Sequence, residues 1–280
     1  MAAKDGAVIS DKEYLEWLTS TSKGCISTEA IELLVEATTS GCNGEIKVDL
    51  GDTLFAIPCS QLPEAWANLI HVHCIDDYQL DSIVKLKPGD IVVDGGAYIG
   101  FFAVKVAHAM KRDGLIIAVE PNPAARSILY KNFELNSLER IARIDPRSLG
   151  GCEYCLREIH VTEPWVNTSM YKSYIAEMQV EVFKTFRVAS ISLKKLMKDH
   201  GLDAISLLKL DVEGAEQEIL ERASSDGILL PSTISQVIVE VHPPLIRVED
   251  IEALLRDNGY KTIVKSFGGG WKQAVVIGIS

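Results

Sequence analysis

From Pro88 onward, short runs of apolar residues alternate with segments whose apolar residues recur at helical spacing. The apolar runs include IVVDG, LIIAVE, IARID, ISLLKLD and QVIVEVH, and the helical segments include FFAVKVAHAMK, AARSILYKNFELN, AEQEILERA and VEDIEALLRDN. Strands that are apolar on both faces and separated by helices are typical of a parallel sheet covered on two sides. The pattern therefore predicts an α/β domain with a doubly wound, mostly parallel sheet.

Two parts of the main domain depart from this alternation. The last two apolar runs, YKTIVKS and AVVIGIS, are separated only by a turn around Gly268–Gly270, which predicts a hairpin and makes the final strand antiparallel, at or inside the sheet. Between residues 152 and 190, CEYCLREIHV and QVEVFKTFRVAS are strand-like and predict an inserted β segment, after which SLKKLMKDH resumes as helix.

The residues before about Ser82 follow a different pattern. SDKEYLEWLTS and STEAIELLVEATTS each combine a leading serine, an acidic first turn and helical apolar spacing, which predicts two short helices. EIKVDL and TLFAI flank Gly51 and Asp52 and predict a hairpin. We therefore divide the chain into a small N-terminal helical and hairpin extension, residues 1–81, acting as a lid or brace, and a main domain, residues 82–280.

Composition narrows the class of partner and the compartment. The chain has 280 residues and a formal net charge of −11, which disfavours nucleic acid because non-specific binding to phosphates draws on Lys and Arg. We find no apolar window of about 18 residues that would span a membrane. The first ten residues, MAAKDGAVIS, lack the basic and apolar regions of a signal peptide. We expect a soluble, cytoplasmic protein with no membrane partner.

Six cysteines are scattered along the first 155 residues: Cys25, Cys42, Cys59, Cys74, Cys152 and Cys155. Their spacing does not resemble the disulfide framework of a small secreted protein, so we expect reduced thiols. Cys152 and Cys155 form one CxxC, but no further pair of ligands follows at zinc spacing. His71, His73 and Cys74 form HxHC, for which neighbouring positions on a strand or helical turn are the simpler explanation.

The stretch DIVVDGGAYIG is predicted to run from a strand into a glycine-rich turn. Ligands of open α/β sheets bind at the carboxyl ends of strands, so this turn is the expected binding loop. Gly95, Ala97 and Gly100 loosely match the dinucleotide fingerprint, and Glu120 ends the next strand, where it can accept from both hydroxyls of an adenosine ribose. The alternative for Glu120 is an exposed strand-end acid.

Asp94, at the base of this turn, indicates which cofactor binds. A carboxylate there repels the pyrophosphate of nicotinamide or flavin dinucleotides. It attracts S-adenosylmethionine (SAM), which carries a sulfonium and an ammonium group instead of phosphates. The alternative role for Asp94 is an N-cap of the following helix. Both acids at this spacing favour SAM as the cofactor.

Four blocks of the sequence, DGGAYIGFFAVKVA, AVEPNPAARSILYKNFELN, LLKLDVEGAEQEIL and VIVEVH, resemble the FkbM family of class I SAM-dependent methyltransferases. The resemblance covers about Leu86 to His242 and implies a Rossmann-like class I methyltransferase fold, SAM as methyl donor, and an oxygen acceptor on a sugar-like or secondary-metabolite substrate. The loop and the resemblance together predict these cofactor-binding residues: Asp94, Gly96, Ala97, Tyr98, Gly100, Glu120, Pro121 and Asn122. The family usually has Asn in place of Tyr98, so we expect a different contact at the methionine end.

The KLDVEGAE block supplies candidate catalytic residues. Lys209 and Asp211 lie two apart at a strand end, so their side chains point to one face. Glu240 ends the next strand, two residues before His242, which predicts an acceptor-side cluster of these four residues. Asp211 is the candidate base or acceptor anchor, and Lys209 tunes its charge or stabilises a developing alkoxide. His242 is the rival base, because the unperturbed pKa of histidine is about 6.5.

Metal binding is the alternative for this cluster. Asp211, Glu213 and Glu240 offer the oxygen ligands that suit Mg²⁺ or a similar hard cation, but the sequence does not choose between the two roles, and we assign no metal site. Glu216 is explained as a first-turn acid that complements the helix dipole. Trp165, in the inserted segment, is the tryptophan that we expect near the acceptor.

The leading functional prediction is SAM-dependent O-methylation of a small-molecule or glycan hydroxyl. One alternative is an RNA methyltransferase on the same fold, which the acidity and the lack of a basic or zinc-bearing RNA module disfavour. Another is a non-catalytic, nucleoside-binding Rossmann-like module, which would not need the charged cluster.

Overall fold

The protein is described here by a computed structural model that covers residues 3–4, 7–8, 10–267 and 273–280. Its central sheet has seven strands in the order β13-β14-β12-β11-β5-β6-β7. These strands are β5 (Asp90–Gly95), β6 (Gly114–Val119), β7 (Ala142–Asp145), β11 (Ile205–Leu210), β12 (Ile234–Val241), β13 (Lys261–Ser266) and β14 (Ala274–Ile279). Only the pairings of β14, with β12 and with β13, are antiparallel. The predicted α/β class is confirmed, with the final strand inside the sheet; the turn at 268–270 lies outside the described residues.

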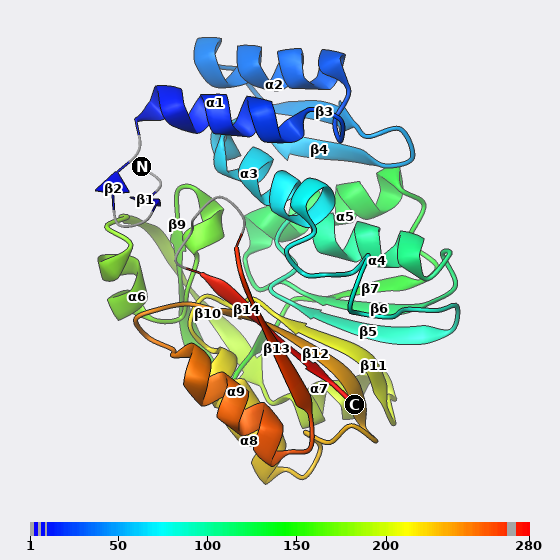
Figure 1. Ribbon diagram of the computed structural model, residues 1–280. Helices are drawn as coiled ribbons and strands as arrows, with labels where there is room; N and C mark the ends of the chain where they lie inside the picture. Colours follow the sequence, from blue (N-terminus) through cyan, green and yellow to red (C-terminus); the bar gives the residue numbers. More distant parts are fainter. Residues whose placement is uncertain (1–2, 5–6, 9, 268–272) are drawn as a thin grey trace.

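Helices cover both faces of this sheet (Figure 1). One face carries α4 (Phe101–Ala109) and α5 (Pro123–Leu135), and the other carries α7 (Leu193–His200), α8 (Glu216–Ser225) and α9 (Val248–Asp257). Successive strand residues point to opposite faces, so Val92 packs in the core under α4 and α5 while Val93 packs in the core under α7 to α9. This explains why the strands are apolar on both faces.

The strand order reverses beside β5. From β5 the chain proceeds outward through β6 and β7, and it then returns to place β11 and β12 on the other side of β5. The carboxyl ends of β5, β6, β11 and β12 therefore surround the switch point, where ligands of such sheets bind.

The first 81 residues form two helices, a hairpin and a further helical segment. The helices α1 (Asp11–Ser22) and α2 (Thr28–Ser40) occupy the predicted segments, and the serines before them cap each helix. The hairpin strands are β3 (Glu45–Asp49) and β4 (Leu54–Pro58); the 3-10 turn η1 (Cys59–Gln61), α3 (Glu64–Ile70) and the π-helical turn η2 (His71–Ile75) follow. The predicted helices and hairpin are present.

This N-terminal part packs on the α4 and α5 face (Figure 1). The amide side chain of Asn132 in α5 accepts from the backbone N–H of Ala56 at 2.7 Å and donates to its carbonyl at 3.2 Å. Asn136, one turn later, makes the same pair of bonds to Leu54 at 3.1 and 2.8 Å. Two asparagines thus satisfy the backbone of β4 as a neighbouring strand would.

The inserted segment forms a separate sheet of three strands in the order β8-β10-β9. They are β8 (Ser148–Leu149), β9 (Tyr154–Thr162) and β10 (Val182–Ile191), with the 3-10 turn η3 (Trp165–Asn167) and α6 (Lys172–Glu177) between β9 and β10. A two-stranded sheet of β1 (Ala3–Lys4) and β2 (Ala7–Val8) lies near the N-terminus. Within the described part of the chain, no helix is long and apolar enough to span a membrane.

All six cysteines are paired, so the expectation of reduced thiols is wrong. The disulfides join Cys25 to Cys74, Cys42 to Cys59, and Cys152 to Cys155. The first pair is 49 residues apart in sequence, and the packing of α1 against α3 and η2 brings it together. Such bonds are typical of oxidising compartments, so the cysteines do not support the cytoplasmic prediction.

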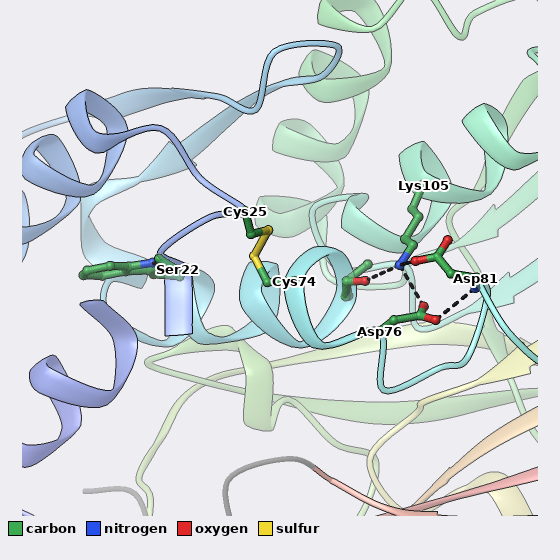
Figure 2. The surroundings of a disulfide bond; sticks show 8 residues. Ser22, Cys25, Cys74, Asp76, Asp81 and Lys105 are labelled. Carbon is green, nitrogen blue, oxygen red and sulfur yellow. Dashed lines mark hydrogen bonds and ion pairs between the residues drawn. A yellow bond between two sulfur atoms is a disulfide. The ribbon is translucent and has the colours of Figure 1, made fainter. Parts of the chain in front are cut away.

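The Cys25–Cys74 disulfide lies beside an ion-pair group that joins η2 and the following loop to α4 (Figure 2). Lys105 of α4 donates to the carbonyl of Val72 at 2.9 Å and pairs with Asp76 at 2.7 Å and Asp81 at 2.9 Å. With Cys74 in a disulfide, the HxHC sequence does not assemble a metal site: the Nε2 of His73 lies 3.1 Å from the carbonyl oxygen of Phe101, and His71 pairs with Asp77.

Replacing Cys25 and Cys74 together by serine is expected to lower the free energy of unfolding by about 2–4 kcal/mol, because the bond closes a long loop of the unfolded chain. The matched control is the Cys152→Ser, Cys155→Ser variant, whose disulfide spans a separation of only 3 residues and restricts the unfolded chain much less. Denaturant unfolding under non-reducing conditions measures both, and equal losses would contradict this account.

Candidate functional site

A cavity of about 910 Å³ lies at the carboxyl ends of the central strands. Its floor includes Gly96, Glu120, Asp211 and Glu240, which follow or end β5, β6, β11 and β12. Two further parts of the chain supply walls. The N-terminal part contributes Tyr14, Glu64, Ala67, Asn68, His71 and Tyr78, and the inserted segment contributes Trp165, Val166, Met170, Tyr174, Glu177 and Met178 among others.

The glycine-rich turn forms one end of the cavity. Gly96 has φ of 77°, and a Cβ there would lie 1.7 Å from the backbone oxygen of Asp211, so only glycine fits. The N–H groups of Gly96 and Ala97 both donate to the carbonyl of Val119 at 3.1 Å, which fixes the turn against the end of β6. Gly100 then leads into α4 with φ of 96°.

Glu120 is held in place by the backbone on both sides. Its Oε2 accepts from the N–H of Tyr98 at 2.8 Å and its Oε1 accepts from the N–H of Asn122 at 2.8 Å. Each oxygen keeps a further lone pair for a ligand hydroxyl. Burial raises the pKa of Glu120 to about 7 despite these bonds. Pro121 and Asn122 line the cavity beside it, and Asn122 caps α5.

SAM affinity is expected to depend on the ionisation of Glu120. The ionised carboxylate accepts more strongly from ribose hydroxyls, so affinity falls as pH drops below about 7, by up to about tenfold between pH 8 and pH 6. Glu120→Gln should weaken binding by about 1–3 kcal/mol at pH 8 and remove this part of the pH dependence. Calorimetric titration at several pH values tests both; a variant with wild-type affinity would make Glu120 a structural acid only.

Asp94 and Lys209 lie beneath the cavity floor, and neither is among its lining residues. The two pair at 3.2 Å, and both are buried. Burial raises the pKa of Asp94, and Lys209 opposes that rise. Because Lys209 compensates the charge of Asp94, this carboxylate repels a pyrophosphate less than the sequence predicts.

Lys209 joins the cofactor turn to the acceptor-side residues. Its Nζ donates to the carbonyl of Gly96 at 2.9 Å and pairs with Asp211 Oδ2 at 3.2 Å. Burial opposes the charge of Lys209, but Asp211, Asp94 and Glu240 hold its pKa above the ordinary value. Lys209 is therefore a fixed cation and not a base at neutral pH.

The structure brings Asp211, Glu240 and His242 together as the strand ends predict. The hydroxyl of Tyr78 donates to Glu240 Oε2 at 2.7 Å and lies 3.3 Å from Asp211 Oδ2. The other carboxylate oxygens, Asp211 Oδ1 and Glu240 Oε1, each lie 3.6 Å from His242 Nε2. Glu213 joins this group, with its Oε2 at 3.5 Å from the same nitrogen.

Glu216 orients His242 from behind. Its Oε1 lies 2.9 Å from His242 Nδ1 and also accepts from the N–H of Val212 at 2.9 Å, while its Oε2 accepts from the N–H of Gly214 at 3.0 Å. The side chain is fully buried, so the expectation that Glu216 only complements a helix dipole is wrong. Because a carboxylate only accepts, Nδ1 is the donor and Nε2 faces the cluster.

The acidic residues outnumber the cations at this end of the cavity. Burial raises the pKa of Glu213 to about 8, and burial together with Asp211 raises that of Glu240. Burial alone would lower the pKa of His242, but Glu213 and Glu216 hold it well above the ordinary value. Such a histidine carries a proton at neutral pH unless another cation replaces it, which argues against His242 as the base.

Three contributors were missed by the sequence analysis: Tyr78, Tyr174 and Glu216. Tyr78 lies in the N-terminal part, 133 residues before Asp211, and nothing local marks it. The ring of Tyr174, in α6, stacks edge-on against His242 with centroids 5.6 Å apart. Only Glu216 had a sequence signal, since it shares the KLDVEGAE block with Asp211.

The chain is similar in sequence to known methyltransferases. Residues 94–262 match a family described as the methyltransferase FkbM domain. Methyltransferase sdnD of Sordaria araneosa is 28% identical over 217 residues, covering 69% of this chain and 82% of the relative. The 31-O-demethyl-FK506 methyltransferase FkbM of Streptomyces tacrolimicus is 25% identical over 206 residues, covering 65% and 76%.

Among solved structures, methyltransferase FkbM from Methylobacillus flagellatus KT aligns with a TM-score of 0.50 at 10% sequence identity. The alignment covers 95% of this chain but 58% of that one. At this identity the likeness shows the fold alone, which is the fold class expected from the sequence.

Proposed function

Because the chain belongs to the FkbM family and is a SAM-dependent methyltransferase, we propose that it methylates a hydroxyl group of a small-molecule or glycan acceptor. The observation that supports this most is that one cavity contains both Glu120 beside the Gly96 turn and the Asp211–Glu240–His242 cluster. One of the relatives, by its name, acts on an oxygen of a small molecule, 31-O-demethyl-FK506.

The charge of the cavity walls favours a neutral or cationic acceptor. Among the described lining residues there is no Lys or Arg, whereas the following carboxylates line the cavity: Glu64, Glu120, Glu177, Asp211, Glu213 and Glu240. A phosphate-bearing acceptor such as RNA would find no Lys or Arg to pair with among these lining residues, and the carboxylates would repel it. Trp165, Tyr98 and Tyr174 offer aromatic surface that suits a sugar ring or a planar acceptor.

The cofactor half of the cavity fits SAM. Glu120 offers both carboxylate oxygens to ribose hydroxyls, and Tyr98 lines the cavity beside it. SAM supplies a methyl group whose bond to sulfur breaks as the bond to the acceptor oxygen forms. The chain therefore has to align the acceptor and take up one proton.

Asp211 is the residue to which we assign proton uptake. Lys209 pairs with its Oδ2, which also lies 3.3 Å from the Tyr78 hydroxyl, and its Oδ1 faces His242 Nε2 at 3.6 Å. Lys209 is a fixed cation that stabilises negative charge developing near it. Glu240, bound by Tyr78, is the neighbouring carboxylate that can share the proton.

Incubation with methyl-labelled SAM and fractionated extract of the source organism tests the proposal. We expect label in polar metabolites or glycans, in a base-stable ether linkage. Label in RNA would favour the alternative RNA methyltransferase. Tight SAM binding without transfer to any fraction would favour the non-catalytic module.

A further inference from the structure

The group of Asp211, Glu213 and His242 has the composition of a metal site. One ligand atom from each of the three residues lies within 4.8 Å of the other two. All three residues line the cavity. We propose that these residues bind a divalent transition-metal ion on the acceptor side of the cavity. The proposal rests on the proposed function only in placing the acceptor oxygen at this ion.

His242 is the observation that separates this group from an ordinary acidic cluster. The residue is 1% exposed, and its Nε2 has no hydrogen-bond partner among the described residues. That nitrogen points at the oxygens of Asp211 and Glu213 at 3.6 and 3.5 Å, which is too long for hydrogen bonds. A ligand between these atoms would satisfy all of them.

The distances suit an ion with a small inward shift of the side chains. Ligands at about 2.0–2.2 Å from a metal lie about 3.0–3.5 Å from their neighbours in octahedral or tetrahedral geometry. The separation of Nε2 from Glu213 Oε2, 3.5 Å, lies at the upper end of this range, and that from Asp211 Oδ1, 3.6 Å, lies slightly above it. An imidazole with two carboxylates suits Mn²⁺, Fe²⁺ or Zn²⁺ better than Mg²⁺ or Ca²⁺, which prefer oxygen ligands alone.

The residues behind the group orient it as the surroundings of metal sites commonly do. Glu216, fixed by the backbone N–H groups of Val212 and Gly214, binds His242 Nδ1 and directs Nε2 toward the other ligands. Lys209 and Tyr78 hold the far oxygen of Asp211. Coordination uses the lone pair of the neutral imidazole at Nε2.

With an ion bound, the residues of the cluster would have different roles in the reaction. The acceptor oxygen binds the ion, which stabilises its negative charge as the O–H bond breaks. Asp211 then acts as a ligand, so the proton that a metal-free Asp211 would take up passes instead to Glu240, which lies beside the three ligands but outside them. The oxygen then forms its bond to the methyl carbon as the carbon–sulfur bond breaks, so no additional reactant is needed.

Metal binding can be measured without knowing the acceptor. The chelator-treated, full-length protein is titrated with Mn²⁺ and, separately, with Zn²⁺. We expect one ion per chain, and binding weakened at least about tenfold in Glu213→Gln and Asp211→Asn. Asp203→Asn is the matched control, because Asp203 is exposed and precedes the opposite end of β11; it should bind the ion as wild type does.

Pulsed electron paramagnetic resonance of the bound Mn²⁺ tests the histidine directly. Coupling to an imidazole nitrogen should be present in the wild type and absent in His242→Gln. The proposal is overturned if neither ion binds, if Glu213→Gln binds as the wild type does, or if no nitrogen coupling is seen. Binding of organic amines in place of either ion would also overturn it, since the cluster would then be a site for an ammonium group.

SAM titration of the same chelator-treated protein distinguishes failure of the metal-site proposal from failure of the proposed function. The cofactor residues around Glu120 do not include the three ligands, so SAM should bind with or without metal. SAM binding without metal binding would overturn the metal site alone. Metal binding without SAM binding would count against the proposed function and leave the metal site standing.

Discussion

Asp211→Asn is expected to lower turnover by roughly 10²–10⁴, the usual contribution of a positioned proton acceptor, while SAM affinity changes only a few-fold. Asparagine keeps the size of the side chain and removes its charge. The residue faces the cluster through Oδ1, whereas the ribose site is built by Glu120 and the backbone around it. Turnover is measured with the identified acceptor, and SAM affinity by calorimetry.

The variant should remain folded because Lys209 keeps two of its partners. Lys209 still pairs with Asp94 and donates to the carbonyl of Gly96 when the charge of Asp211 is removed. Asp203→Asn, before the opposite end of the same strand, controls for the loss of one carboxylate and should have wild-type turnover. Near-normal turnover in Asp211→Asn would reject its role and direct attention to Glu240.

Chelation distinguishes the two roles that Asp211 can play. If Asp211 is a metal ligand, wild-type activity should disappear with chelator and return with Mn²⁺ or Zn²⁺. If Asp211 is a base without a metal, chelation should have no effect on activity. The proposed metal site requires the first result.

The parts of the site that the sequence predicted are those fixed by strand ends. In a parallel sheet the carboxyl ends of neighbouring strands meet at one edge, so Asp211 and Glu240 had to approach each other once β11 and β12 were recognised. The same reasoning placed Glu120 beside the glycine turn. Periodicity likewise predicted the order of strands and helices, because the central strands β5, β6 and β11 are buried on both faces.

The parts that were missed depend on contacts between distant segments. The hydroxyl of Tyr78 binds Glu240, 162 residues later in the chain, and Cys25 is bonded to Cys74, 49 residues later. No local sequence pattern predicts either contact. The compensation of the Asp94 charge by Lys209 was not predicted, for a related reason. Asp94 and Lys209 are register partners in β5 and β11, so their pairing follows from strand adjacency that sequence spacing alone does not give.

Deletion of residues 1–81 is expected to abolish cooperative folding. These residues share one apolar core with α4 and α5, in which Phe55, Trp66 and Ile70 are fully buried. The ring of Phe55 packs edge-on against Phe101 of α4 with centroids 4.9 Å apart. Removing the extension would expose that surface to water, at about 1.5–3 kcal/mol for each large side chain. Circular dichroism and thermal unfolding measure the loss.

A shorter deletion that ends before Ser10 is the control, because it keeps α1 with its capping residue and every later element; it should retain wild-type thermal unfolding. A soluble, cooperatively folding chain that begins at Ser82 would make the extension an independent unit and contradict the role of a brace.

The second role of the extension, as a wall of the cavity, is tested by a substitution that does not disturb the core. Tyr78→Phe removes only the hydroxyl that binds Glu240 and lies near Asp211. Since hydrogen bonds to charged groups contribute about 1.5–3 kcal/mol, we expect at least about tenfold lower turnover with unchanged unfolding. Unchanged turnover in Tyr78→Phe would restrict the extension to a structural role.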